Sequence, residues 1–139
     1  MSWTTPRTWV TGEIVTAAQM DEQVRDNLDF VHGALPSNSQ TVTSNVLGTV
    51  YQNTTSAMRF VTVTIGHTVV SDGQARNVAY VKSTSAPDTA VAEIRSEYSA
   101  VVTSNRLCMT FCVPAGYYYK VTDEDSGGGT STLIKWTEW

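Results

Sequence analysis

Paired carboxylates are the first residues whose spacing could support catalysis. Glu93 and Glu97 stand four residues apart in the run TAVAEIRSEY, which has the composition of a β-strand. On one extended strand their Cα atoms would be about 13 Å apart, because each residue advances the chain by about 3.3 Å. Both glycosidase geometries need a closer pair. The spacing therefore favours a solvent-facing strand surface over a hydrolytic site.

A second acidic group, Asp123-Glu124-Asp125, is followed by Ser126 and Gly127. Its oxygen atoms are of the kind that bind calcium, but the spacing does not follow the ligand pattern of a dedicated calcium loop. We interpret the segment as an acidic turn.

Thiol and imidazole groups give no metal-binding pattern. Cys108 and Cys112 would be about 13 Å apart on one strand, beyond the roughly 7 Å that a disulfide bridges between Cα atoms, so we expect two free thiols. The two histidines, His32 and His67, do not have zinc-finger spacing. His67 follows Gly66 and is interpreted as a turn residue.

Phosphate loops and nucleophile elbows are also absent from the sequence. The sequence therefore predicts a non-enzymatic protein without metal or cofactor.

Aromatic residues cluster near the C-terminus and could form a sugar-stacking platform. They are Tyr117, Tyr118, Tyr119, Trp136 and Trp139. Successive strand residues point to opposite faces, so some of these rings must point inward, and a buried aromatic removes about 150 to 250 Å² from water. Core packing or subunit contact is therefore favoured, with Tyr118 and Trp139 kept as candidates for glycan contact.

Residues 16–35 form the one convincing helix pattern. Thr16 and Gln19 have the spacing of a capping box, which satisfies amide groups at a helix start. At the other end, Gly33 could close the helix in the left-handed conformation, and Pro36 could not continue it. The sequence thus predicts both ends of this helix.

A narrow apolar stripe runs along the predicted helix. Its members recur at steps of four, four, three and four residues, and are Met20, Val24, Leu28, Val31 and Leu35. Such a stripe is closer to a coiled-coil seam than to the broad face of a core helix, and an isolated helix of about 30 Å is marginal in water. Either the helix packs on its own β-domain, or it self-associates into a short bundle whose register Asn27 helps to set.

The first 15 residues contain Trp3, Pro6 and Trp9 in a segment too short to form its own core. Two tryptophans in such an arm must be buried against something else. They either fold back on the helix or sheet of the same chain, or insert into a groove of another protein, where tryptophan is a common anchor.

The overall composition limits the partners. The chain has 139 residues, of which 41% are hydrophobic and 16% are charged, with a net charge of −4. This is enough for one domain, or one domain plus an arm, and the lack of a basic block argues against nucleic-acid binding. No apolar run approaches the roughly 20 residues of a membrane span, and the N-terminus lacks a signal-peptide core. We therefore expect synthesis in a cytoplasm and no membrane insertion.

After residue 35 the sequence changes from helical to β-type patterning. Residues 36–44 are rich in Ser, Asn, Gln and Thr and read as a linker between the arm-and-helix segment, 1–35, and a β-domain, 45–139. The expected strands are 46–52, AMRFVTVTIG, NVAYVKST, TAVAEIRSEY, RLCMTFCV, 117–121 and TLIKWTEW, seven or eight in all. In the fifth of these runs Leu107, Met109, Phe111 and Val113 share one face. The fold class predicted is mainly β, an antiparallel sandwich or jelly roll preceded by an extended arm and one α-helix.

The N-terminal motifs resemble those of a known group of proteins. Trp3, Pro6, Trp9, Gly12-Glu13, Thr16-Ala17 and the run Arg25-Asp26-Asn27-Leu28 are similar to the N-terminal segment of small structural proteins of tailed bacteriophages. Asp21 departs from that pattern, where Asn is more usual.

The β-domain carries a second resemblance. The runs YQNTT, FVTVT, FCVPAGYYYKV and the ending WTEW are similar to the β-domain at the tips of phage fibres and in other virion proteins. The glycine-rich loop before the last strand is present as Gly127-Gly128-Gly129, whereas Ala115 stands where a second Pro is usual.

Together the two resemblances imply a virion protein made in the host bacterial cytoplasm. The expected form is a short homotrimeric fibre on the head or tail. Its arm would dock on a capsid, portal-adaptor or tail component, and its β-domain would point outward for host attachment. Two alternatives stay open: a capsid decoration protein, and a carbohydrate-binding tip that recognises a host surface glycan.

Overall fold

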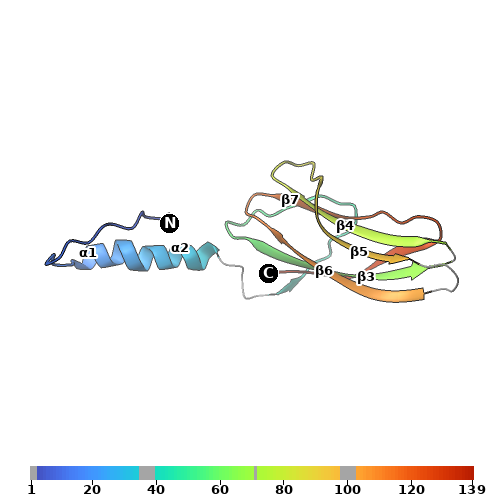
Figure 1. Ribbon diagram of the computed structural model, residues 1–139, viewed down its shortest axis with the longest axis horizontal. Helices are drawn as coiled ribbons and strands as arrows, with labels where there is room; N and C mark the ends of the chain where they lie inside the picture. The colour runs from blue at the N-terminus through green and yellow to red at the C-terminus, as the bar shows by residue number, and fades with distance from the viewer. Residues whose placement is uncertain (1–2, 35–39, 71, 98–102) are drawn as a thin grey trace. The chain divides into compact units, whose positions relative to one another are not determined.

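A computed structural model of the chain describes residues 3–34, 40–70, 72–97 and 103–139. The chain divides into two compact units, Met1–Leu35 and Pro36–Trp139. The first is helical, and the second contains the strands (Figure 1).

The helix of the first unit is continuous but not uniform. It consists of α1 (Ala17–Met20), the π-helical turn η1 (Asp21–Arg25) and α2 (Asp26–Ala34). Its start is as predicted, since the Gln19 amide donates to Thr16 Oγ1 at 3.3 Å and the Thr16 amide donates to Gln19 Oε1 at 2.8 Å. The capping box is therefore confirmed.

The predicted closure of the helix at Gly33 is wrong, because α2 continues through this residue to Ala34. Glycine permits the left-handed conformation but does not require it, and a glycine inside a helix costs only about 1 kcal/mol relative to alanine. Leu35 and Pro36, also named in the predicted helix end, lie outside the described residues.

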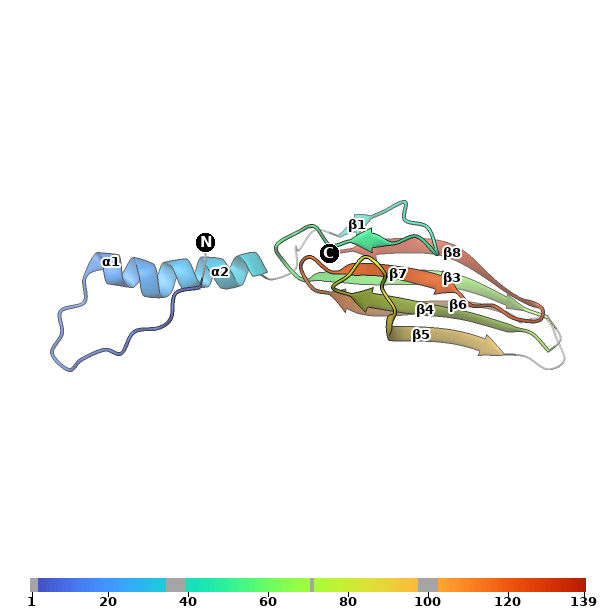
Figure 2. The same ribbon diagram turned by 90° about the horizontal axis from the view of Figure 1, so that it is seen from above.

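Eight strands are described in the second unit. They are β1 (Thr41–Val42), β2 (Tyr51–Gln52), β3 (Arg59–Val69), β4 (Gln74–Lys82), β5 (Thr89–Glu97), β6 (Thr103–Val113), β7 (Tyr118–Asp123) and β8 (Gly129–Glu138). They form two four-stranded antiparallel sheets with the orders β1-β8-β3-β6 and β2-β7-β4-β5 (Figure 2). These two orders are those of a jelly roll, so the predicted mainly β fold with one N-terminal helix is confirmed.

The core lies between the two sheets and draws side chains from both. Val61, Val63 and Ile65 of β3 alternate with outward residues, as a half-buried strand requires. The predicted inner face of β6 is also confirmed: Met109, Phe111 and Val113 are buried, and Leu107 is half-buried. The other buried members of this core are Ala79, Val81, Tyr119, Val121 and Trp136.

The structure differs from the prediction before β3. The expected strand 46–52 shrinks to Tyr51–Gln52, because Gly48 adopts a positive φ of 80° and the preceding residues form a turn. Conversely, Thr41 and Val42, placed in the linker by their composition, pair with Glu138 and Thr137 as β1. The second outcome depends on a partner strand far along the chain, β8.

His67 is not in a turn, as its neighbour Gly66 had suggested, but near the C-terminal end of β3 and fully buried. Gly66 has a packing role instead, since a Cβ atom there would lie 3.3 Å from Ile134 Cδ1 of β8. The His67 ring connects the two sheets: Nε2 lies 2.7 Å from Asn77 Oδ1 of β4, and Nδ1 lies 2.9 Å from Ser96 Oγ of β5.

The hydrogen-bond network assigns the roles of the His67 nitrogens. Asn77 Nδ2 donates to the Thr122 carbonyl, so Asn77 Oδ1 is an acceptor, and it also receives the Ser131 hydroxyl at 2.9 Å. His67 Nε2 therefore donates to Asn77 Oδ1, and in the neutral ring Nδ1 accepts from the Ser96 hydroxyl. The hydrogen-bonded series Ser96, His67 and Asn77 resembles a nucleophile with its base. Because the imidazole is fully buried and Ser96 is also buried, the series serves as a link between the two sheets.

Replacing His67 by alanine is expected to lower the free energy of unfolding by about 2 to 4 kcal/mol. The variant leaves a cavity and removes both hydrogen bonds of the ring, so that Ser96 and Asn77 each lose one hydrogen-bond partner. Urea unfolding followed by circular dichroism measures the change, with the exposed His32→Ala as the matched control. Equal midpoints for the two variants would contradict the structural role of His67.

Candidate docking site on the N-terminal unit

Residues 3–15, here called the arm, run back along the helix of the same unit. The Thr4 amide donates to Asn27 Oδ1 at 2.9 Å, and Asn27 Nδ2 donates to the Thr4 carbonyl at 3.1 Å. One turn earlier on the helix, Gln23 Oε1 accepts from the Arg7 amide at 2.9 Å. Because later arm residues meet earlier helix residues, the arm and helix are antiparallel (Figure 1).

The middle of the arm is held by its own side chains. Arg7 pairs with Glu13 at 2.5 Å, and its guanidinium lies 4.9 Å from the centre of the Trp9 ring. Glu13 also accepts from Gln19 of α1, at 3.4 Å. Gly12 has a φ of 85°, a left-handed conformation that most residues avoid. The Gly-Glu motif seen in the sequence thus closes the turn that returns the chain to the helix.

The two arm tryptophans are only half covered. Trp3 meets Phe30 of α2 edge to face, with ring centres 6.1 Å apart, but 49% of Trp3 and 44% of Trp9 stay exposed. Of the two alternatives for the arm, folding back on the helix is what the structure shows. Docking of Trp3, Pro6 and Trp9 on another protein stays a prediction.

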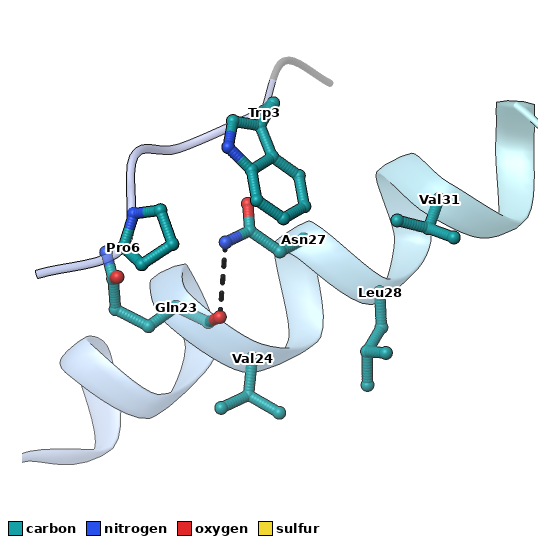
Figure 3. A pocket seen from close by; sticks show the side chains of 7 residues that line it. All are labelled: Trp3, Pro6, Gln23, Val24, Asn27, Leu28 and Val31. Atoms are coloured by element: carbon teal, nitrogen blue, oxygen red, sulfur yellow. Dashed lines mark hydrogen bonds between the residues drawn. The ribbon is translucent and has the colours of Figure 1, made fainter.

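A groove of about 300 Å³ lies beside the contact between the arm and the helix and is lined by both. It is lined by Trp3 and Pro6 of the arm and by Gln23, Val24, Asn27, Leu28 and Val31 of the helix (Figure 3). Apart from Gln23 and Asn27, the lining side chains are apolar. Such a groove can accept an apolar side chain but offers little to a charged ligand.

The structure brings most of the predicted oligomerisation residues to this groove. Val24, Leu28 and Val31 line it, and together with Met20 they are between 43% and 63% exposed. Leu35 lies outside the described residues. Asn27 is 7% exposed, and its amide is engaged with Thr4 and the Gln23 carbonyl. Its first role is therefore to hold the arm, a contact that the sequence did not reveal.

Replacing Asn27 by alanine is expected to release the arm. Two reciprocal hydrogen bonds of about 0.5 to 1.5 kcal/mol each are lost. The fraction of molecules whose arm is detached from the helix should therefore rise about tenfold or more. Trypsin cleavage after Arg7, followed by mass spectrometry of the fragment beginning at Thr8, measures this opening. The exposed Asn105→Ala is the control, and equal cleavage rates would show that Asn27 does not hold the arm.

The candidate glycan residues are not gathered into a platform. Tyr119 and Trp136 are buried in the core, as the strand alternation required for some of the aromatic residues. Tyr118 and Trp139 are half-buried, but Tyr118 begins β7 whereas Trp139 pairs with Phe60 of β3, in the other sheet. A glycan role for Tyr118 and Trp139 stays a prediction that no contact between them supports.

A buried carboxylate organises the aromatic core and was missed in the sequence. Glu138 Oε1 accepts from Tyr119 at 2.6 Å, from Asn45 at 2.9 Å and from Trp136 Nε1 at 3.0 Å. Its other oxygen, Oε2, pairs with Arg59 at 2.6 Å. The spacing of two between Trp136 and Glu138, on the strand-like ending TLIKWTEW, was the available signal that both share one face.

Alkaline pH is expected to destabilise the β-domain through Tyr119. Burial first, and then the hydrogen bond to Glu138, raise the pKa of Tyr119 above its ordinary value. Because the pKa of Tyr119 is higher in the folded protein than in the unfolded chain, its protonated hydroxyl stabilises the fold. This stabilisation is complete below about pH 10, the pKa of a tyrosine in the unfolded chain, and is lost as the pH rises above it. Urea midpoints measured from pH 8 to 11 should fall above pH 10, and Tyr119→Phe should flatten that fall. An unchanged slope in the variant would contradict the assignment.

Four of the acidic residues considered for catalysis or calcium, Glu93, Glu97, Glu124 and Asp125, are engaged with the protein's own groups. Arg76 pairs with Glu93 at 2.9 Å and with Glu124 at 2.5 Å, and the hydrogen bond from Arg76 lowers the pKa of Glu93. Asp125 accepts from the Arg76 amide and the Ser131 hydroxyl. Within the described ranges, no group of three or more His, Cys, Asp or Glu residues could hold a metal ion.

No protein-family model matches this chain, and a search of curated proteins finds no match. In the part of the chain that the structure describes, none of the helices has the length and hydropathy needed to cross a membrane.

Proposed function

We propose that this protein is a structural component of a tailed-bacteriophage virion, a short homotrimeric fibre. The helices of three chains associate through the apolar stripe, the arm side of the N-terminal unit attaches to the particle, and the jelly-roll domains are displayed. The exposure of Val24, Leu28 and Val31 on one face of the helix is the observation that supports this most directly.

The energetics favour an assembly over a free helix. Full burial of a Val or Leu side chain contributes about 1.5 to 3 kcal/mol, and an isolated helix of this length is marginal in water. Three chains that bury the stripe against one another gain this stabilisation at each residue of the stripe. A partner for the stripe would therefore stabilise the helix.

The rest of the chain agrees with a display function. A compact jelly roll whose two sheets are joined by the hydrogen bonds of His67 and Glu138 makes a stable head group, and three copies side by side strengthen any weak contact through avidity. Trp9, half-exposed near the Gly12 turn, is an anchor for a capsid, portal-adaptor or tail component. The resemblances of the N-terminal motifs and of the β-domain to phage virion proteins support the same assignment.

Solution mass tests the assembly. Light scattering is expected to give a trimer for the full chain and a monomer for a chain without residues 1–35. A monomer in both cases would contradict the free-standing fibre and favour the alternative, a capsid decoration protein that associates only on the shell.

Particle labelling tests the virion location. Gold-labelled antibody against the β-domain should decorate purified particles of a phage that encodes this chain, at the head or at the tail. Deletion of residues 1–35 should remove the label while leaving the β-domain folded in the lysate. Unlabelled wild-type particles would overturn the proposal.

A further inference from the structure

The π turn corrects the phase of the apolar stripe. A coiled-coil seam alternates steps of three and four residues, whereas the steps from Met20 to Val31 are four, four and three. The surplus residue lies between Met20 and Val24, inside η1 (Asp21–Arg25), where the Asp26 amide bonds to the Asp21 carbonyl five residues back. A turn closed by such a bond takes up about one extra residue. Met20, Val24, Leu28 and Val31 therefore occupy successive a, d, a and d positions.

These positions identify the groove as one half of a coiled-coil contact. In a parallel coiled coil, an a-position side chain enters a hole made by the preceding d and g residues, the a residue and the next d residue of the facing helix. In this helix those four residues are Val24, Asn27, Leu28 and Val31. All four line the groove, and Trp3 and Pro6 add a wall on the Asn27 side (Figure 3).

The charges of the helix fit a second parallel copy. Its four carboxylates fall on the outer b, c and f positions, and are Asp21, Glu22, Asp26 and Asp29. The polar residues at the e and g positions beside the seam are Gln19, Arg25, Asn27 and His32. Arg25 is already paired with Asp21 at 3.2 Å and with Asp26 at 2.9 Å on its own helix. Parallel copies thus meet without opposing carboxylates.

We propose that the groove receives Leu28 of a second copy of this chain in a parallel coiled coil, with Trp3 of the arm covering the inserted side chain. This interface rests on the homotrimeric fibre proposed above and specifies its contacts. The arm then has two parts with different partners. Trp3 and Pro6 belong to the contact between copies, whereas Trp9 stays available to the particle.

Cysteine crosslinking tests the parallel register in the full-length chain. Leu28→Cys is made in a Cys108→Ser, Cys112→Ser background and oxidised with diamide, which takes up the two electrons and two protons released as two thiols become one disulfide. Identical a residues face one another in a parallel seam, so covalent dimers are expected. Asp29→Cys, at an outer position, is the matched control and should give at least tenfold less dimer. Val31→Cys, at a d position, repeats the test if Leu28→Cys folds poorly.

Two tryptophan variants test the role of the arm. Trp3→Ala is expected to raise the concentration at which half of the chains are assembled at least tenfold, and Trp9→Ala to change it less than twofold. If the chain assembles but Leu28→Cys crosslinks no better than Asp29→Cys, or Trp3→Ala matches Trp9→Ala, this interface is wrong while the fibre proposal stands. A full chain that is monomeric at every concentration overturns both.

Discussion

Replacement of Val24 and Val31 together by aspartate is expected to convert the full-length protein into soluble monomers. Both valines line the groove and lie on the exposed stripe of the helix. In a trimer the double variant would bury six carboxylates without partners, and each such burial costs several kcal/mol. Every 1.4 kcal/mol weakens association tenfold, so the loss should be at least about a thousandfold. Light scattering over a dilution series measures it.

The control for this variant changes equally apolar residues elsewhere in the same unit. Val10→Asp together with Ile14→Asp alters two exposed residues outside the helix and should leave the oligomer intact. Circular dichroism should show that the β-domain is folded in both double variants. Assembly of the Val24 and Val31 variant at the wild-type concentration would show that the helix is not the oligomerising element.

Removal of the Glu138 carboxylate is expected to give the largest loss of stability in the β-domain. Glu138→Ala leaves Tyr119, Trp136 and Arg59 without their shared acceptor, in a site where both sheets meet. Loss of one partner of a buried charged network costs about 3 to 5 kcal/mol. Urea unfolding followed by tryptophan fluorescence measures the change, because Trp136 is buried only in the folded protein.

Two further variants separate charge from shape at this site. Glu138→Gln keeps the volume and one acceptor oxygen, so it should be less harmful than Glu138→Ala. Glu97→Ala removes an exposed carboxylate that pairs with Arg95 and should leave the midpoint unchanged. If Glu138→Ala behaved like Glu97→Ala, the carboxylate would not be organising the core.

Local patterns in the sequence were sufficient for several features. The Thr16 and Gln19 spacing predicted the helix start, because a capping box involves only neighbouring residues. The alternation of Met109, Phe111 and Val113 predicted the inner face of β6, because side-chain direction in a strand has a period of two. The same alternation, repeated over many short runs without helices, predicted the antiparallel β-domain and its class.

Long-range contacts decided the rest. The burial of His67 depends on Asn77 and Ser96, and the strand at Thr41 depends on Glu138. Neither feature could be predicted from neighbouring residues in the sequence. The arm pairs Thr4 with Asn27 across 23 residues, which no periodicity could indicate. By itself the sequence determined which residues are apolar, where the helix begins and that the remainder forms strands. Only the tertiary structure decided which groups share a site, because contacts between distant segments depend on how the whole chain packs.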